Sequence, residues 1–186
     1  MLQGEKHMKK LMLIICFSVY WILMALNIII NNGNIATLLL YIALYLPLTI
    51  AIIKEYDVFA LFIIILYEIA ECFMNLMGVA SALVEFDESS IILIITQFIT
   101  AFYAFTMLSS AIKFLRNRDN SLKLYVLVLG MLRCIFTVVN FIVAKEFSSE
   151  MILDMFSNII FIIAISSYII FFENKEIKIM VHDDEK

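Results

Sequence analysis

Two glutamates and an asparagine stand inside one of the most apolar stretches of this chain of 186 residues. Glu68, Glu71 and Asn75 are spaced i, i+3 and i+7, so in a helix they share one face. Gly78 and Ala82 continue that face, whereas the rest of the segment is mostly Ile, Leu, Phe, Val and Met. Because ionised groups are costly in hydrocarbon, we expect this stripe to face protein or water, where carboxylates can pair with a cation.

A second polar stripe follows about 60 residues later, at helical spacing. It consists of Gly130, Arg133, Thr137, Asn140 and Ala144. Counting a rise of roughly 1.5 Å per residue puts Arg133 at the depth of Glu68 and Glu71. A lone charge at the bilayer centre costs about 2.5–3.5 kcal/mol, and pairing offsets much of this. We therefore expect Arg133 to pair with one glutamate, leaving the other protonated or available to a ligand cation.

The composition indicates a polytopic membrane protein. Hydrophobic residues make up 64% of the chain and charged residues 16%, with a mean hydropathy of +1.02. Soluble domains have roughly 45–50% apolar residues. We predict an all-α fold, a bundle of six transmembrane helices over 11–172, between a basic N-terminus, 1–10, and a charged tail, 173–186. The six predicted helices are 11–30, 35–53, 58–84, 91–114, 122–144 and 151–172.

The distribution of Lys and Arg predicts the orientation of the bundle. Cytoplasmic loops retain basic residues, and with six spans 11 of the 13 in this chain fall on the side of both termini. We therefore predict a multi-pass protein of the cell membrane with both termini cytoplasmic. The opposite side is acidic; its acidic residues form either a solvated rim or a mouth that attracts cations. They are Glu85, Asp87, Glu88, Glu146, Glu150 and Asp154.

Further polar side chains fall in the outer half of the predicted bundle. They are Asn27, Gln97, Thr100, Asp154 and Asn158. Such groups can line a water-filled vestibule that ends at the charges, or they can form separate interhelical hydrogen bonds worth on the order of 0.6–2 kcal/mol each. The candidate ligand-binding residues are Glu68, Glu71, Asn75, Arg133, Thr137, Asn140, Gln97 and Asn158.

Several kinds of chemistry lack their residues here. Both histidines, His7 and His182, lie outside the predicted spans, so an intramembrane haem site or histidine-dependent protease has no ligand or base. No lysine lies mid-span, which excludes retinal attachment. We expect no enzyme activity, catalytic residue, metal site or cofactor. The cysteines and the aromatic residues within the spans are expected to serve packing. These are Cys16, Cys72, Cys134, Tyr20, Trp21, Tyr41, Tyr45, Tyr67 and Tyr103.

In outline, six helices with an outer-half site resemble the substrate-binding S-components of energy-coupling-factor vitamin transporters. Those proteins carry small-residue repeats on their first helix, where 11–30 offers only Ser18 and Ala25. The outline also resembles membrane parts of peptide-pheromone sensors and bacteriocin immunity proteins.

The first hypothesis is binding or transport of a small polar or cationic ligand from the extracytoplasmic side. The alternative is a non-transporting sensor, immunity or interaction protein whose intramembrane charges are structural.

The expected partners follow from these two hypotheses. They are the lipid bilayer and a small-molecule ligand, with a membrane-protein partner or a homo-oligomer left open. No nucleic acid partner is expected.

Overall fold

The computed structural model describes residues 3–30, 35–84, 90–116, 121–144 and 148–171, and these are helical apart from short turns. The predicted all-α class is confirmed. The helices are α1 (Gln3–Ile30), α2 (Ile35–Ile53), α3 (Asp57–Val84), α4 (Ser90–Leu115), α5 (Lys123–Ala144) and α6 (Ser149–Phe171). Helix α1 begins before the predicted start at residue 11, because Gln, Glu, Lys and Met favour a helix as much as the apolar residues after them.

Four of these helices are long and apolar enough to cross a membrane, counted over the residues that the structure describes. The candidate spans are Met8–Ile30, Ser90–Leu115, Lys123–Val143 and Ser149–Phe171. Many large apolar side chains point outward from the bundle, such as Ile29, Phe73 and Met131. This outward apolar surface fits a protein surrounded by lipid rather than by water.

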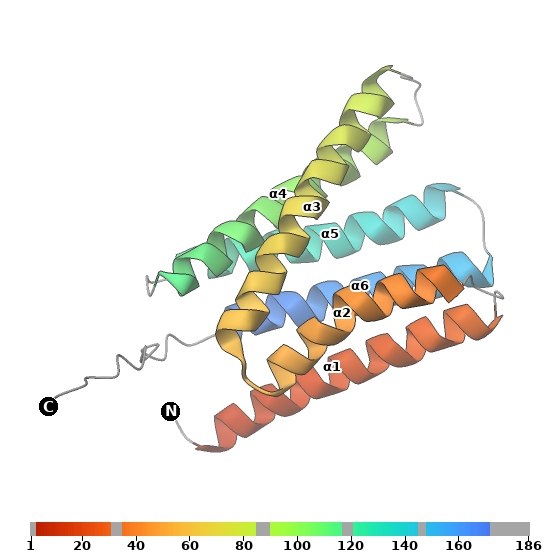
Figure 1. The fold of residues 1–186 in the computed structure, drawn as a ribbon. Helices are drawn as coiled ribbons and strands as arrows, with labels where there is room; N and C mark the ends of the chain where they lie inside the picture. The colour runs from red at the N-terminus through yellow and green to blue at the C-terminus, as the bar shows by residue number, and fades with distance from the viewer. Residues whose placement is uncertain (1–2, 31–34, 85–89, 117–120, 145–147, 172–186) are drawn as a thin grey trace, which may run out of the picture.

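The helices pack as two pairs connected through α5. Helix α3 lies along α4, and α1 lies along α6, while α5 contacts both α4 and α6; α2 lies against α3 and α1. Figure 1 shows that α1 begins and α6 ends at the same end of the bundle. It also shows α3 and α4 crossing the other helices at an angle, so that the end of α3 and the start of α4 stand apart from them.

The tightly packed core is concentrated toward the end of the bundle where α2 turns into α3. Leu48, Leu61, Phe114 and Ile169 are among its buried members, and they come from α2, α3, α4 and α6. Toward the other end, α3 is much more open, and Val84 is 86% exposed. The polar residues of α3 therefore begin where the apolar core ends.

The α2–α3 turn is closed by a helix C-cap. The amide of Tyr56 donates to the carbonyl of Ala51 at 2.8 Å, and that of Glu55 donates to Ile52 at 3.2 Å. Glu55 has a φ of 59°, the left-handed conformation that this capping motif requires. Glu55 Oε1 forms an ion pair with Nζ of Lys10 in α1 at 3.1 Å, and this pair connects the turn to the first helix.

Candidate functional site

Arg133 of α5 lies beside Glu71 of α3. Its Nη2 is 3.4 Å from Glu71 Oε2, and the arginine side chain is 9% exposed against 25% for the glutamate. Each residue belongs to the polar stripe of its helix, and the contact agrees with the similar depth that residue counts along the two helices predict. A guanidinium this well buried needs a counter-charge, because removing it from water without one is expensive.

Glu71 accepts hydrogen bonds from two side chains of its own helix as well. Tyr67 donates its hydroxyl to Oε1 at 2.8 Å, and Asn75 Nδ2 donates to Oε2 at 3.1 Å and to the Glu71 carbonyl at 2.7 Å. The three residues are four apart, so each reaches the next along one helical face. With Arg133, these donors occupy both carboxylate oxygens and fix the orientation of the side chain.

Arg133 is also in contact with the interior of the bundle. Its guanidinium lies 5.1 Å from the ring centroid of Tyr103, and the hydroxyls of Tyr103 and Ser166 are 2.8 Å apart. Gly130, one turn earlier, allows this approach, since a Cβ there would lie 3.0 Å from Ser166 Oγ and 3.3 Å from Tyr103 Cε2. The small residue of the α5 stripe is therefore explained by close packing on α4 and α6.

Glu68 is the most deeply buried carboxyl group among the described residues. It is 0% exposed, and neither of its oxygens has a hydrogen-bond partner within the described part of the protein. Arg133 and Glu71 are the charged groups that act on it electrostatically. Glu68 thus belongs to the charge cluster, but it does not line the cavity beside Glu71.

A polar cavity of about 270 Å³ opens beside Glu71. Its lining residues come from α1, α2, α3 and α6. They are Tyr20, Met24, Tyr45, Tyr67, Glu71, Asp154, Ser157, Asn158 and Phe161. Asp154 and Asn158 are solvent-exposed and lie near the start of α6, so the cavity reaches the surface at the end of the bundle opposite the α2–α3 turn.

Asp154 places a second carboxylate on the cavity wall. It accepts a hydrogen bond from Asn27 Nδ2 of α1, and no lysine or arginine within the described ranges pairs with it. The cluster and the cavity wall together thus contain three carboxyl groups, Glu68, Glu71 and Asp154, and one buried cation, Arg133. Their combined formal charge, if all are ionised, is negative by two. The described residues contain no group of three or more His, Cys, Asp or Glu side chains that could hold a metal ion.

Aromatic rings from four helices form the inner wall of the cavity. Tyr20, Tyr45, Tyr67 and Phe161 come from α1, α2, α3 and α6, and all four line the space. The centroids of neighbouring rings are 4.7 to 5.8 Å apart, mostly in edge-to-face geometry. Because Tyr20 and Phe161 are almost fully buried and the rings pack on one another, the space itself is bounded mainly by polar groups, including the Glu71 and Asp154 carboxylates.

The remaining sequence candidates lie elsewhere. Thr137 donates its hydroxyl to the Arg133 carbonyl at 2.8 Å, within its own helix. Gln97 of α4 lies against Gly78 of α3, and its Oε1 has no partner among the described groups. Asn140 is half-buried on α5. Of the eight candidates, Glu71 and Asn158 line the cavity, whereas Asn75 and Arg133 contact Glu71.

The ligand-binding residues predicted from the sequence did not include Asp154, Ser157 or the aromatic residues that line the cavity. The position of Tyr67 could have been predicted from the sequence, because Tyr67 precedes Glu71 by four residues and so lies on the same helical face. The sequence does not predict that Tyr20, Tyr45 and Phe161 lie at the cavity, since their convergence depends on how four helices pack. Tyr20, Tyr45 and Tyr67, which were expected to serve packing, pack on one another and also line the cavity.

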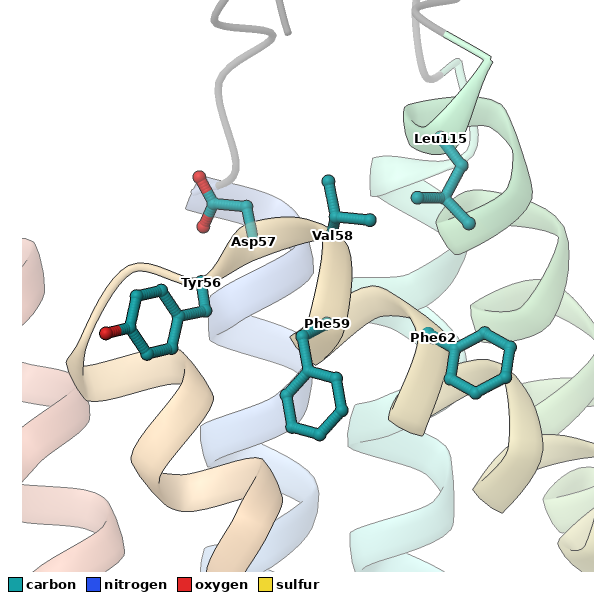
Figure 2. Close-up of a pocket in the computed structure, with 6 residues that line it drawn as sticks. All are labelled: Tyr56, Asp57, Val58, Phe59, Phe62 and Leu115. Atoms are coloured by element: carbon teal, nitrogen blue, oxygen red, sulfur yellow. The ribbon is translucent and has the colours of Figure 1, made fainter. Parts of the chain in front are cut away.

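A second depression lies at the other end of the bundle, where α3 begins (Figure 2). It has a volume of about 540 Å³ and a mostly apolar lining: Tyr56, Asp57, Val58, Phe59, Phe62 and Leu115. Figure 2 shows the Asp57 carboxylate pointing away from the rings of Phe59 and Phe62. Asp57 instead accepts a hydrogen bond from the Tyr168 hydroxyl at 3.2 Å. This depression offers hydrocarbon surface and no polar anchor.

No protein-family model, no curated protein and no solved structure matches the chain. The candidate site therefore rests on its own geometry and chemistry.

Proposed function

We propose that this protein is a multi-pass membrane protein that takes a small cationic ligand from the extracytoplasmic side into the cavity beside Glu71. Six helices cross the bilayer in this proposal, and both termini are cytoplasmic. The observation that carries it is a surface-connected cavity with two carboxylates, Glu71 and Asp154, on its wall. The protein then either passes the ligand across the membrane or holds it as a receptor.

The charge of the cluster favours a cation. Arg133 compensates one carboxylate, and Asp154 accepts only a neutral amide among the described residues. A cleft with low-dielectric walls focuses the field of such groups and raises the local concentration of counter-ions. An anion entering the same space would meet Asp154 first.

The size of the cavity favours a small ligand. Its volume of about 270 Å³ lies just below the roughly 300–1,000 Å³ typical of sites for drug-sized molecules. A metabolite-sized cation with a few heavy atoms fits, whereas a peptide does not.

The basic residues support the proposed orientation. Lys10, Lys54 and Lys113 lie at the ends of helices that meet near the α2–α3 turn, and the cavity opens at the opposite end. Because basic residues are retained on the cytoplasmic side, the cavity then opens outward.

A binding experiment tests the proposal. Purified protein in detergent is titrated with small organic cations and with anions of similar size, and its thermal stability is recorded. We expect at least one cation and no anion to stabilise it, with the effect reduced at least tenfold in Glu71→Gln and Asp154→Asn. Glu55→Gln is the matched control, because that carboxylate is exposed at the other end of the bundle and should leave binding unchanged.

One observation favours a second candidate. Glu71 is fully engaged by Arg133, Tyr67 and Asn75, which fits a cluster that only joins α3 to α5 in a sensor, immunity or interaction protein. In that case no cation stabilises the wild-type protein, and Glu71→Gln lowers stability without any effect on binding. A folded, correctly inserted Glu71→Gln variant that has lost binding supports the first candidate.

A further inference from the structure

We infer that Glu68 is a proton-binding site and that a cation entering the cavity displaces its proton. The cation takes the place of Arg133 at Glu71, and Arg133 turns to Glu68. This inference rests on the proposed function and adds to it the exchange of one proton for one cation. It is carried by a fully buried carboxyl group that has no hydrogen-bond partner among the described residues and stands one helical turn from an ion pair.

The first argument is the burial of Glu68. The side chain is 0% exposed, and neither carboxyl oxygen has a hydrogen-bond partner within the part of the chain that the structure describes. An ionised carboxylate without partners is far more costly to bury than the neutral acid, so this arrangement favours the protonated group. A proton on Glu68 also leaves the cluster neutral, since Arg133 and Glu71 compensate one another.

The groups that act electrostatically on Glu68 come from three helices. They are Glu71 and Tyr67 of α3, Tyr103 of α4 and Arg133 of α5. Helices α2 and α6 contain no lysine or arginine, so neither supplies a second cation. Arg133 is thus the one cation among these groups, and two carboxyl groups compete for it.

The second argument is the geometry of the ion pair. Arg133 Nη2 lies 3.4 Å from Glu71 Oε2, which is longer than the roughly 2.7–2.9 Å of a tight charge-assisted hydrogen bond. Glu71 keeps two further donors, Tyr67 and Asn75, when the guanidinium turns away. Glu68 precedes Glu71 by three residues, a rise of roughly 4.5 Å along the helix. A long arginine side chain can therefore serve either carboxyl group.

The third argument is the position of Glu71 at the cavity. Glu71 lines this polar space, whereas Glu68 does not line it and is fully buried. A cation that enters meets Glu71 first and repels the Arg133 guanidinium on the same carboxylate, because like charges at close range destabilise one another. Arg133 then pairs with Glu68, which gives up its proton.

The exchange balances in atoms and in charge. Before it, protonated Glu68, ionised Glu71 and Arg133 have no net charge. The O–H bond of Glu68 breaks, its electron pair stays on the carboxylate, and the proton passes to water. Afterwards two carboxylates face Arg133 and the incoming cation, again with no net charge. Each cation bound thus releases one proton, and a transporter built in this way exchanges cations for protons.

Infrared spectroscopy tests the proton on Glu68 without any ligand. Purified full-length protein in detergent at neutral pH is compared with Glu68→Gln and with Glu55→Gln, the matched control whose carboxylate is exposed at the other end of the bundle. We expect the carbonyl stretch of a protonated carboxylic acid in the wild type and in Glu55→Gln, and its loss in Glu68→Gln. Absence of this band from the wild type, or the same band in Glu68→Gln, overturns the inference.

Cation titration tests the exchange. Methylammonium, ethylammonium and potassium are titrated into the same three proteins by calorimetry over a range of pH, in buffers whose different ionisation enthalpies count the protons released. For the wild type and Glu55→Gln we expect about one proton per cation and an affinity that rises about tenfold per pH unit while Glu68 of the free protein stays protonated. In Glu68→Gln we expect no proton release and less than about a twofold change in affinity over the same range.

The outcomes distinguish the inference from the proposed function beneath it. Cation binding that releases no proton overturns the inference and leaves a cation site. Proton release that persists in Glu68→Gln assigns the proton to Glu71 or Asp154 and also overturns it. If none of the three cations binds, the proposed function and the exchange are both overturned, and the infrared band still decides whether Glu68 holds a proton.

Discussion

The ion pair between Arg133 and Glu71 is the contact at the residue scale on which the site depends. A fully buried pair costs about 3–5 kcal/mol when one partner is removed, because the other charge is left uncompensated. The glutamate side chain is 25% exposed, so we expect Arg133→Leu or Glu71→Leu to lower the free energy of unfolding by on the order of 2–3 kcal/mol.

The double variant Arg133→Leu/Glu71→Leu should recover part of that loss. Thermal melts of the detergent-solubilised single and double variants measure the coupling directly. Strict additivity would mean that α3 and α5 do not interact through these two side chains.

Glu68 should respond differently from Glu71, although the two stand one helical turn apart. Neither oxygen of Glu68 has a partner among the described residues, so Glu68→Gln removes a potential buried charge without breaking a hydrogen bond. We expect the melting temperature of the Glu68→Gln variant to equal or exceed that of the wild type. Glu71→Gln weakens the bond from Arg133 and should cost about 1–3 kcal/mol. A larger loss in Glu68→Gln than in Glu71→Gln would show that Glu68 is ionised and carries the pairing.

At the scale of the elements, Gly130 controls how closely α5 approaches α4 and α6. The atoms that a Cβ would meet, Ser166 Oγ and Tyr103 Cε2, belong to a buried hydrogen-bonded pair and have little room to move. Gly130→Val should therefore destabilise the protein by about 1–3 kcal/mol through overpacking. It should also displace Arg133, which lies against the same tyrosine.

Ala80→Val is the control for this prediction, because Ala80 is an exposed residue of α3. Melting temperatures of the two variants provide the comparison. Equal stability of Gly130→Val and wild type would indicate that α5 can shift without cost.

The element scale also shows what the sequence could predict. Long apolar stretches with polar breaks predict the helices, and the spacing of Glu68, Glu71 and Asn75 predicts that they share a face. The level of Arg133 follows from a count of residues along α5. Which side chains of α1, α2 and α6 meet them depends on helix crossing angles and on contacts distant in sequence, so the grouping of Tyr20, Tyr45 and Phe161 was not predictable.

At the scale of the whole molecule, the proposed topology has a direct test. In a variant whose native cysteines Cys16, Cys72 and Cys134 are replaced, single cysteines are placed at Ser148, Asp57 and Asn120. We expect a membrane-impermeant thiol reagent added to intact cells to label Ser148→Cys and to leave the other two unlabelled until the membrane is opened. Labelling of Asn120→Cys from outside would contradict six spans with cytoplasmic termini.

The central claim is that a cavity open to the outside attracts cations through its carboxylates. It is tested most directly at Asn158, an exposed residue of the cavity wall. A cysteine at this position is labelled on intact cells with a trimethylammonium methanethiosulfonate and with its anionic sulfonate counterpart. The ratio of the two rates is compared with the same ratio for Ser148→Cys, outside the cavity lining.

We expect the cationic reagent to be favoured at least fivefold more at Asn158→Cys than at Ser148→Cys. The preference should fall when Asp154→Asn is added. A ratio equal to that at Ser148→Cys, or labelling of Asn158→Cys only after the membrane is opened, would contradict the claim.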